Sequence, residues 1–253
     1  MNVLRMWRYR LLRLCCALLW ISAVSNAYSQ EPKAILAEVM QQYTDSTFLS
    51  FDLKFTVSYL ESRDQVFDSL HGSFALAGSK YAYQLDGTSA VSDGTTAMIL
   101  FNEDKLMYLS KPATPGLSVG PVTLIDSAMW KNGFQHWELG QTDDGSEYIL
   151  KCSLPDGARC RKVTLIIDKK KRLIRHAQYE MLSEQLVGEA TPMILFTAGQ
   201  RYSLVNVRFS NYSRTLINTS LFDLGRYFRK SATGYAVTEE FDNFQLFLGS
   251  TNL

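Results

Sequence analysis

The feature that most constrains the fold is a strict alternation of apolar and polar residues that begins near residue 50. From Phe51 to Tyr59 every second residue is apolar, and polar residues fill the positions between them. Successive side chains of a β-strand point to opposite faces of its sheet, so this pattern predicts a strand with one apolar face. The same period of two recurs along most of the chain and indicates a protein built mainly from strands.

The complete pattern predicts about eleven strands in meander order, without strand-helix-strand alternation. They are expected at 51–59, 67–77, 80–85, 97–101, 105–110, 136–139, 147–153, 162–168, 173–180, 202–211 and 241–248. Such an order favours an antiparallel sheet curled toward a barrel, with helices packed on or in it. Because 46% of the residues are hydrophobic and no linker or repeat interrupts the chain, we expect one domain over 30–253.

Three segments are expected to be helical. The apolar residues between Pro32 and Thr44 recur at a spacing of 3.6 residues, and Pro32 suits the first turn of a helix. A loop rich in Pro and Gly at 111–121 precedes a short expected helix, Val122–Lys131, inserted between strands. One or two further helical turns are expected in Leu221–Phe228.

The first 29 residues have the layout of a secretory signal peptide. Arginines at 5, 8, 10 and 13 precede a short apolar run, Leu14–Ile21, and a stretch of small and polar residues. The run is shorter than the ~20 residues that cross a bilayer as a helix. We expect cleavage after Ala27 or Ser29 and a periplasmic protein; an uncleaved membrane anchor is the alternative. A lipoprotein would need a cysteine at the cleavage site, where this chain has none.

The sequence contains no recognisable catalytic or metal-binding constellation. Its three histidines, His71, His136 and His176, lie far apart without a metal-ligand spacing, and no phosphate loop, nucleophile elbow or zinc-protease helix is present. We therefore expect no catalytic residues, no metal and no cofactor, and a protein that is not an enzyme. After signal removal the formal charge is −3 and no long basic run remains, so nucleic acid is not an expected partner.

Two cysteines, Cys152 and Cys160, follow the signal segment and flank a Pro-Asp-Gly turn. A three-residue loop would place the two cysteines opposite each other on antiparallel strands, within reach of a disulfide. An exported protein meets an oxidising compartment. We predict the Cys152–Cys160 disulfide; two free buried thiols are the alternative.

The order of elements from Ala34 to Tyr179 resembles that of the outer-membrane lipoprotein carrier family, LolA and its LolB-like relatives. The resemblance rests on a helix at 34–43, a strand at 48–60, the stretch Gly72-Ser73-Phe74-Ala75-Leu76 with Lys80-Tyr81, and Val91-Ser92-Asp93-Gly94-Thr95-Thr96 before an apolar strand. Val122–Lys131 falls where the family has a lid helix.

The resemblance implies an incomplete antiparallel barrel, closed by helices, whose apolar cavity takes the acyl chains of lipoproteins or another lipid. It implies a monomer that crosses the periplasm from an inner-membrane donor to an outer-membrane acceptor. The alternating apolar positions become candidate cavity-lining residues: Leu53, Phe55, Val57, Phe74, Leu76, Tyr81, Tyr83, Met98 and Leu100. The candidate lid residues are Val122, Ile125 and Met129.

Two features depart from the family pattern. Carriers commonly have an arginine just after the second strand, where this chain has Ala77-Gly78-Ser79 and only Lys80 nearby. The region from Thr191 to Leu253 has no match in the family. The chain is thus either the general carrier or a divergent relative. A periplasmic sensor or scaffold that binds a protein partner, an enzyme with a dispersed site, and an ordinary packed core remain as alternatives.

Overall fold

The computed structural model describes residues 32–112, 136–155, 158, 160–186, 201–215, 219–231 and 234–250. The chain divides into two compact units, Met1–Leu36 and Ala37–Leu253. In the first unit the described residues are Pro32–Leu36, which form the start of a helix. The sheet and the candidate site belong to the second unit.

The described residues contain one α-helix, four 3-10 helices and fourteen strands. The helices are α2 (Pro32–Thr44), η1 (Ser183–Gln185), η4 (Thr219–Phe222), η5 (Leu224–Arg226) and η6 (Glu239–Phe241). The strands are β1 (Leu49–Tyr59), β2 (Val66–Ala77), β3 (Lys80–Leu85), β4 (Thr88–Ser92), β5 (Ala97–Phe101), β6 (Leu106–Ser110), β7 (His136–Gln141), β8 (Glu147–Ser153), β9 (Cys160–Asp168), β10 (Leu173–Leu182), β11 (Tyr202–Ser213), β12 (Phe228–Ser231), β13 (Gly234–Val237) and β14 (Gln245–Leu248).

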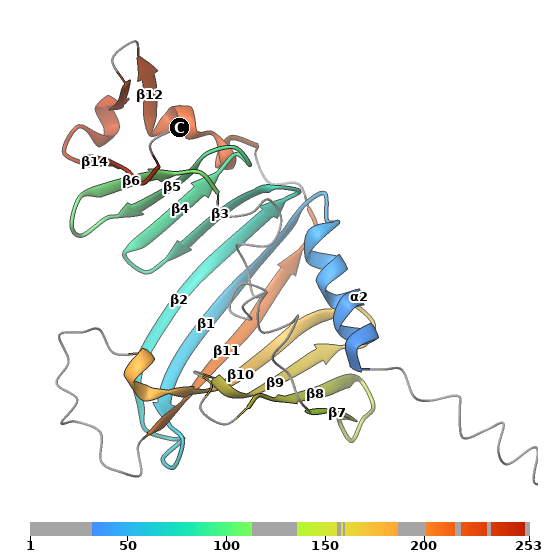
Figure 1. Cartoon of the computed structure of the whole chain (residues 1–253). Helices are drawn as coiled ribbons and strands as arrows, with labels where there is room; N and C mark the ends of the chain where they lie inside the picture. The colour runs from blue at the N-terminus through green and yellow to red at the C-terminus, as the bar shows by residue number, and fades with distance from the viewer. Residues whose placement is uncertain are drawn as a thin grey trace, which may run out of the picture. The chain divides into compact units, whose positions relative to one another are not determined.

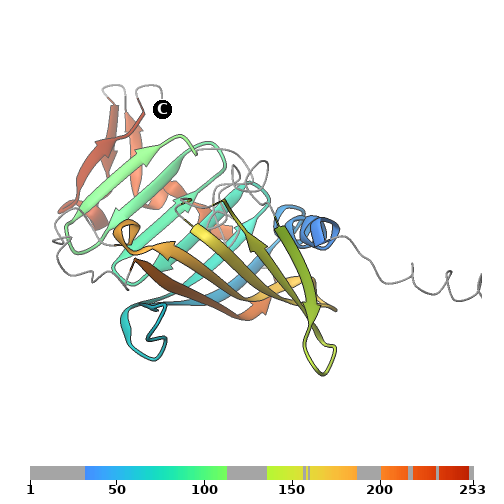
Figure 2. The same cartoon turned by 60° about the horizontal axis from the view of Figure 1, so that its bottom comes forward.

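Twelve of these strands form one curved, open sheet in the order β14-β6-β5-β4-β3-β2-β1-β11-β10-β9-β8-β7 (Figures 1 and 2). Two antiparallel meanders, β1 to β6 and β7 to β11, join where β1 pairs with β11. The ends of the sheet, β7 and β14, do not pair with each other. The expected incomplete antiparallel barrel is therefore confirmed, with a parallel β14–β6 pair at one edge.

The two faces of the sheet differ, and the register between strands defines them. We call the face that carries Phe51, Phe74 and Tyr83 the inner face; these residues are direct partners on β1, β2 and β3. The face that carries Asp52, Ser73 and Gln84, the adjacent row of partners, is the outer face. The rows alternate because side-chain direction alternates along each strand.

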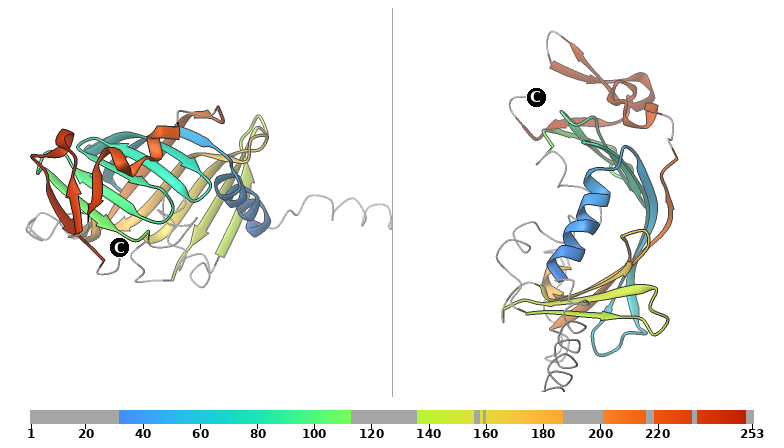
Figure 3. Two further views of the ribbon diagram at one scale, coloured as in Figure 1. Left: turned by 90° about the horizontal axis from the view of Figure 1, so that it is seen from above. Right: turned by 90° about the vertical axis from the view of Figure 1, so that its right-hand side faces the viewer.

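The residues from 219 to 250, here called the C-terminal segment, pack against the outer face at the β4–β6 end. Phe222, Leu224 and Phe228 from this segment form one buried cluster with outer-face residues such as Met98 and Leu109. Figure 3 shows the segment beside β5 and β6. The same cluster includes Ala75, Ala82 and Val91, so the segment covers outer-face residues from β2 to β6 and leaves the row of Asp52, Ser73 and Gln84 exposed.

Helix α2 has the bounds that its apolar spacing predicts. In the second unit, Val39 and Tyr43 are buried, and Tyr43 meets Phe51 edge-on with ring centroids 6.2 Å apart. The carboxylate of Glu38 lies 2.9 Å from Nε of Arg172 in the β9–β10 hairpin. The Ala37–Thr44 part of α2 is thus fixed to the inner face by burial and by an ion pair.

Some elements differ from the sequence expectation. The strands β4, β12 and β13 were not predicted, because their short sequences contain small or charged residues rather than a clear alternation. The expected strand at 241–248 is shorter and begins at Gln245, after η6. The helical turns expected in Leu221–Phe228 correspond to η4 and η5.

Candidate functional site

The inner face carries a continuous row of large side chains across seven strands. Successive register partners, from β1 through β6 to β14, form this row, which we call the inner row: Phe51, Phe74, Tyr83, Ala90, Ile99, Tyr108 and Phe247. Six of its seven members are bulky and apolar or aromatic. The row is therefore an apolar stripe that crosses half of the sheet.

The aromatic rings of the inner row pack closely against one another. Phe51 stacks on Phe74 with centroids 5.5 Å apart and planes inclined by 2°, and Phe74 stacks on Tyr83 at 4.9 Å. At the other end, Tyr108 stacks on Phe247 at 5.6 Å. Such offset ring pairs add about 0.5–1.5 kcal/mol beyond the burial of their area.

Exposure differs along the inner row: its first two rings and Ala90 are buried, and the other large members are partly or largely exposed. Phe51 is 1% exposed and Phe74 is 8% exposed, whereas Tyr83, Ile99 and Phe247 are only partly buried, and Tyr108 is 43% exposed. A packed core buries its large apolar residues throughout, so exposed rings continuous with a buried stripe distinguish this face.

Seven of the nine candidate lining residues lie together on the inner face. Leu53, Phe74 and Leu76 are buried, and Phe55, Val57, Tyr81 and Tyr83 are partly exposed. Their register confirms that they share one face. Whether they line a ligand site remains a prediction.

The other two candidates, Met98 and Leu100, lie on the outer face, so their placement with the inner residues was wrong. Met98 pairs with Val91, an outer-face partner of Ala82, and both Met98 and Leu100 belong to the cluster under the C-terminal segment. The inner position on β5 is Ile99. Ile99, Tyr108 and Phe247 are thus inner-face residues that sequence reasoning missed, because the unpredicted β4 shifted the alternation by one strand.

The candidate lid residues Val122, Ile125 and Met129, and the expected helix around them, lie outside the described residues. The same holds for the signal segment, 1–29, with both of its candidate cleavage sites.

Two cysteine thiols and one tyrosine hydroxyl are buried in apolar surroundings on the inner face of β8–β10. Burial and the proximity of Cys160 raise the pKa of Cys152 to about 12, and burial raises the pKa of Cys160 to about 11. Burial also raises the pKa of Tyr179 well above 10, and its hydroxyl has no hydrogen-bond partner among the described residues. Both thiols and the phenol are therefore neutral at physiological pH.

The predicted Cys152–Cys160 disulfide is not formed in the structure, where both thiols are free and buried. The register behind that prediction was wrong. Cys152 faces Val163, and Ser153 pairs with Lys162, while Cys160 pairs with Met181 of β10. The connection between β8 and β9 is longer than a three-residue turn, so the cysteines are not opposite each other.

A tyrosine pair holds α2 to the sheet at a bulge in β10. The hydroxyls of Tyr43 and Tyr212 are 2.7 Å apart. The Tyr212 hydroxyl donates to the carbonyl of Ile174 at 2.6 Å, and the backbone N–H of Ile174 donates to the Tyr43 hydroxyl at 3.2 Å. Ile174 pairs with Ile167 of β9, whereas the β10–β11 ladder begins only at His176, so the two tyrosines supply partners for both polar backbone groups of Ile174.

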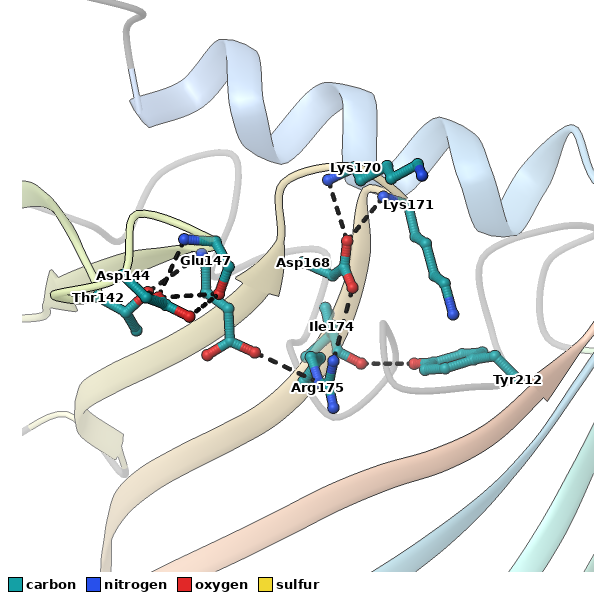
Figure 4. A network of polar contacts seen from close by, with 10 residues as sticks. Thr142, Asp144, Glu147, Asp168, Lys170, Lys171, Ile174, Arg175 and Tyr212 are labelled. Carbon is teal, nitrogen blue, oxygen red and sulfur yellow. Dashed lines mark hydrogen bonds and ion pairs between the residues drawn. The ribbon is translucent and has the colours of Figure 1, made fainter.

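Next to this bulge, charges are paired at the protein surface (Figure 4). Arg175 lies 3.3 Å from Glu147 and 3.6 Å from Asp168, and Asp168 also accepts hydrogen bonds from the backbone N–H groups of Lys170 and Lys171. These contacts close the β9–β10 hairpin. Arg175, Glu147 and Asp168 each have a structural partner, so the cluster stabilises the turn rather than forming a reactive centre.

Within the described ranges, no group of three or more His, Cys, Asp or Glu side chains is placed to hold a metal ion. No helix among the same residues has the length and apolar character needed to cross a membrane. The strongest chemical feature of the described site is thus the apolar and aromatic surface of the inner face.

No family model and no curated protein matches the sequence. Among solved structures, an uncharacterised conserved protein from Thermus thermophilus superposes with a TM-score of 0.47 at 11% identity, over 85% of this chain and 98% of that one. A LolA superfamily protein from Nitrosomonas europaea gives 0.35 at 12% identity, over 76% and 97% of the two chains. A chain of the Pseudomonas aeruginosa MucA/MucB complex gives 0.36 at 12% identity, over 82% of this chain and 63% of that one.

Proposed function

We propose that this protein is a periplasmic, non-enzymatic carrier that binds the acyl chains of lipoproteins, or another lipid, on the inner face of its sheet. The observation that carries the proposal is the inner row, whose stacked rings are buried at Phe51 and increasingly exposed toward Tyr108. Acyl chains bind to surfaces that are apolar and only partly covered by the protein itself. Transit from an inner-membrane donor to an outer-membrane acceptor is part of the proposal, supported by the family resemblance of the sequence.

Energetics constrain how such a carrier works. Moving one methylene out of water contributes about 0.8 kcal/mol, so three chains of ~14 methylenes would contribute more than ~30 kcal/mol. That figure exceeds the ceiling of about 18–21 kcal/mol for non-covalent affinity. The relevant transfer is from membrane to protein, between two apolar surroundings, where the difference is small. The carrier therefore takes up and releases cargo without a large driving force.

In the proposed mechanism, the apolar stripe of Val122, Ile125 and Met129 covers the inner face until cargo replaces it. A polar substitution such as Ile125→Asn then weakens closure and shifts the protein toward its open form. Tighter binding of an acyl probe by this variant supports the mechanism, and unchanged binding contradicts it.

Two neighbouring residues on β1 offer a matched test of the inner face. Phe55 points to the inner face and Thr56 to the outer face, and both are partly exposed. Cis-parinaric acid, a fluorescent fatty acid, is titrated into the wild-type protein, Phe55→Glu and Thr56→Glu, and thermal melting is recorded for each. We expect binding at least tenfold weaker in Phe55→Glu and unchanged in Thr56→Glu.

The carrier proposal fails if the wild-type protein binds no acyl probe saturably. It also fails if both glutamate variants weaken binding equally, because the site would then not be on the inner face. A Phe55→Glu variant that unfolds while Thr56→Glu stays folded would identify the inner face as an ordinary core.

A second candidate function is a sensor or scaffold that binds a protein partner, favoured by a separate apolar surface. The start of β2 extends past the end of β3, whose pairing begins at Gly72 (Figure 1). In this extension Val66 and Phe67 are 52% and 44% exposed, and they lie beyond Leu70, the inner-face partner of Phe55. A partner site there predicts that Phe67→Ser abolishes a stoichiometric complex and leaves acyl binding intact.

A further inference from the structure

The outer face contains a pocket beside the C-terminal segment, and four inner-row residues, Phe51, Phe74, Tyr83 and Ala90, are also among the residues that line it. The pocket has a volume of about 450 Å³ and lies between β1–β4 and the C-terminal segment. This volume is within the range of ligand sites, about 300–1,000 Å³. Strands β3 and β4 contact η4 directly, so the segment forms a wall beside the sheet.

The floor of the pocket consists of two adjacent rows of register partners. The first row is polar and contains Asp52, Ser73, Gln84 and Ser89. The second row is small and mainly apolar and contains Ser50, Ala75, Ala82 and Val91. Neighbouring strands are about 4.8 Å apart, so each row extends roughly 14 Å across the four strands. Short side chains predominate in both rows, so the floor of the pocket lies close to the backbone of the sheet.

Two members of the polar row, Asp52 and Ser89, are held in place by side-chain hydrogen bonds before any ligand arrives. The amide of Asn211 donates to the carboxylate of Asp52 at 2.7 Å, and Asn211 has a left-handed backbone (φ 53°) beside the bulge between β1 and β11. The side-chain amide of Asn102 donates to the hydroxyl of Ser89 at 3.3 Å. Fixed side chains lose little conformational entropy on binding.

The wall adds one aliphatic residue, one aromatic residue and one cation. Leu221, Arg226 and Tyr227 line the pocket from η4 and the end of η5. The guanidinium of Arg226 lies 2.6 Å from Glu240, which offsets its charge. With Asp52 as the lining carboxylate, the site has no excess of positive charge and does not favour an anion such as phosphate.

We propose that this pocket binds a neutral saccharide of one or two rings. Sugar hydroxyls both donate and accept hydrogen bonds, and the polar row supplies carboxylate, amide and hydroxyl groups side by side. The C–H face of a sugar ring is apolar and contacts the second row where Ala75 and Ala82 remain 5% and 6% exposed beside the C-terminal segment. A disaccharide about 10 Å long fits within the roughly 14 Å length of the rows. The site is independent of the acyl carrier function.

Isothermal titration of the full chain with chitobiose, cellobiose and maltose tests the proposal. We expect saturable binding of at least one disaccharide. Gln84→Ala removes an exposed amide from the polar row and is expected to weaken binding about three- to tenfold, the effect of one hydrogen bond. Ala82→Trp fills the floor and is expected to abolish binding. Lys54→Trp, on the same face of β1 but outside the pocket, is the matched control and should bind like the wild type.

The proposal is overturned if none of the three disaccharides binds, or if Gln84→Ala binds as tightly as Lys54→Trp. The Gln84→Ala arm decides the question even if Ala82→Trp does not fold, because Gln84 is exposed. Cis-parinaric acid binding is measured on the same variants and is expected to be unchanged. Loss of acyl binding alone would count against the carrier function and leave the saccharide site standing.

Discussion

The inner and outer faces of β1–β4 carry opposite kinds of side chain on the same four strands. On the inner face, Phe51, Phe74 and Tyr83 stack into a continuous apolar stripe. On the outer face, the adjacent row of Asp52, Ser73 and Gln84 is polar and exposed. The two rows are one residue apart on each strand, because successive side chains point to opposite faces. The large rings therefore fill the inner face, whereas the shorter side chains of the outer row leave space above the sheet.

The outer face shows a second contrast along its length. Its rows are polar or small on β1–β4 but become large and apolar on β5 and β6, at Met98, Leu100 and Leu109. The C-terminal segment covers these large residues and also packs on the small residues Ala75, Ala82 and Val91 of β2–β4. A sheet that is apolar on both faces needs a second layer, and the segment provides one.

The largest expected effect tests whether the inner row carries the stability of the sheet. Phe51→Ala removes the ring that packs on Phe74, Phe209 and Tyr43. Truncation of a buried Phe costs about 3–5 kcal/mol in free energy of unfolding. Ser73→Ala, in the outer row of the same strands, should change it by less than ~0.5 kcal/mol. Urea denaturation of both variants measures the difference, and equal losses would refute the contrast.

An intermediate effect is expected from the buried thiols of β8 and β9. Their pKa values are raised from 9.0 to about 12 and 11 in the folded protein. Above pH 9 the unfolded chain releases these protons while the folded chain retains them, so stability is present below pH 9 and lost as pH rises. Each thiol contributes about 1.4 kcal/mol per pH unit in this window.

Comparison with the Cys152→Ala/Cys160→Ala double variant isolates this contribution, because buried tyrosines titrate in both proteins. Between pH 8 and pH 10 the wild type should lose roughly 2–3 kcal/mol more free energy of unfolding than the variant. Chemical denaturation at the two pH values measures it. An identical pH dependence of both proteins would mean that the thiols are not buried.

The smallest effect is expected from a surface ion pair. Nε of Arg161 lies 2.8 Å from Glu180, and these side chains are 42% and 16% exposed. A double-mutant cycle with Arg161→Ala and Glu180→Ala should give a coupling of about 0.2–1 kcal/mol that weakens in high salt. The cycle separates this pair from the contact of Arg161 with the ring of Tyr202. A coupling above ~2 kcal/mol would show that polar contacts contribute as much to the free energy of unfolding as contacts of the inner row.

Much of the fold could be predicted from the sequence because its strands alternate regularly. The bounds of α2, the long strand β1 and the shared face of Phe55, Phe74 and Tyr83 all follow from periodicity. Neither the pairing of β1 with β11 nor the parallel position of β14 has a local signal, because both depend on partners distant in sequence.

The errors in the candidate site have one cause, which is register. Periodicity indicates which residues of one strand share a face, but it does not relate that face to the next strand. The missed strand β4 placed Met98 and Leu100 on the wrong face, and a miscounted hairpin placed Cys152 opposite Cys160. The outer pocket depends on residues from β1, β4 and η5, and no linear pattern brings these together.

The pairing of β1 with β11 also has a consequence for folding. Phe55 pairs with Val207, so the centre of the sheet joins an early part of the chain to one of its last strands. Until β11 emerges during synthesis, one edge of β1 is left without its partner. Strands in that state are slow to fold and prone to aggregate, because long loops must close before pairing stabilises them. A newly made chain therefore cannot complete the centre of its sheet until synthesis has passed residue 213.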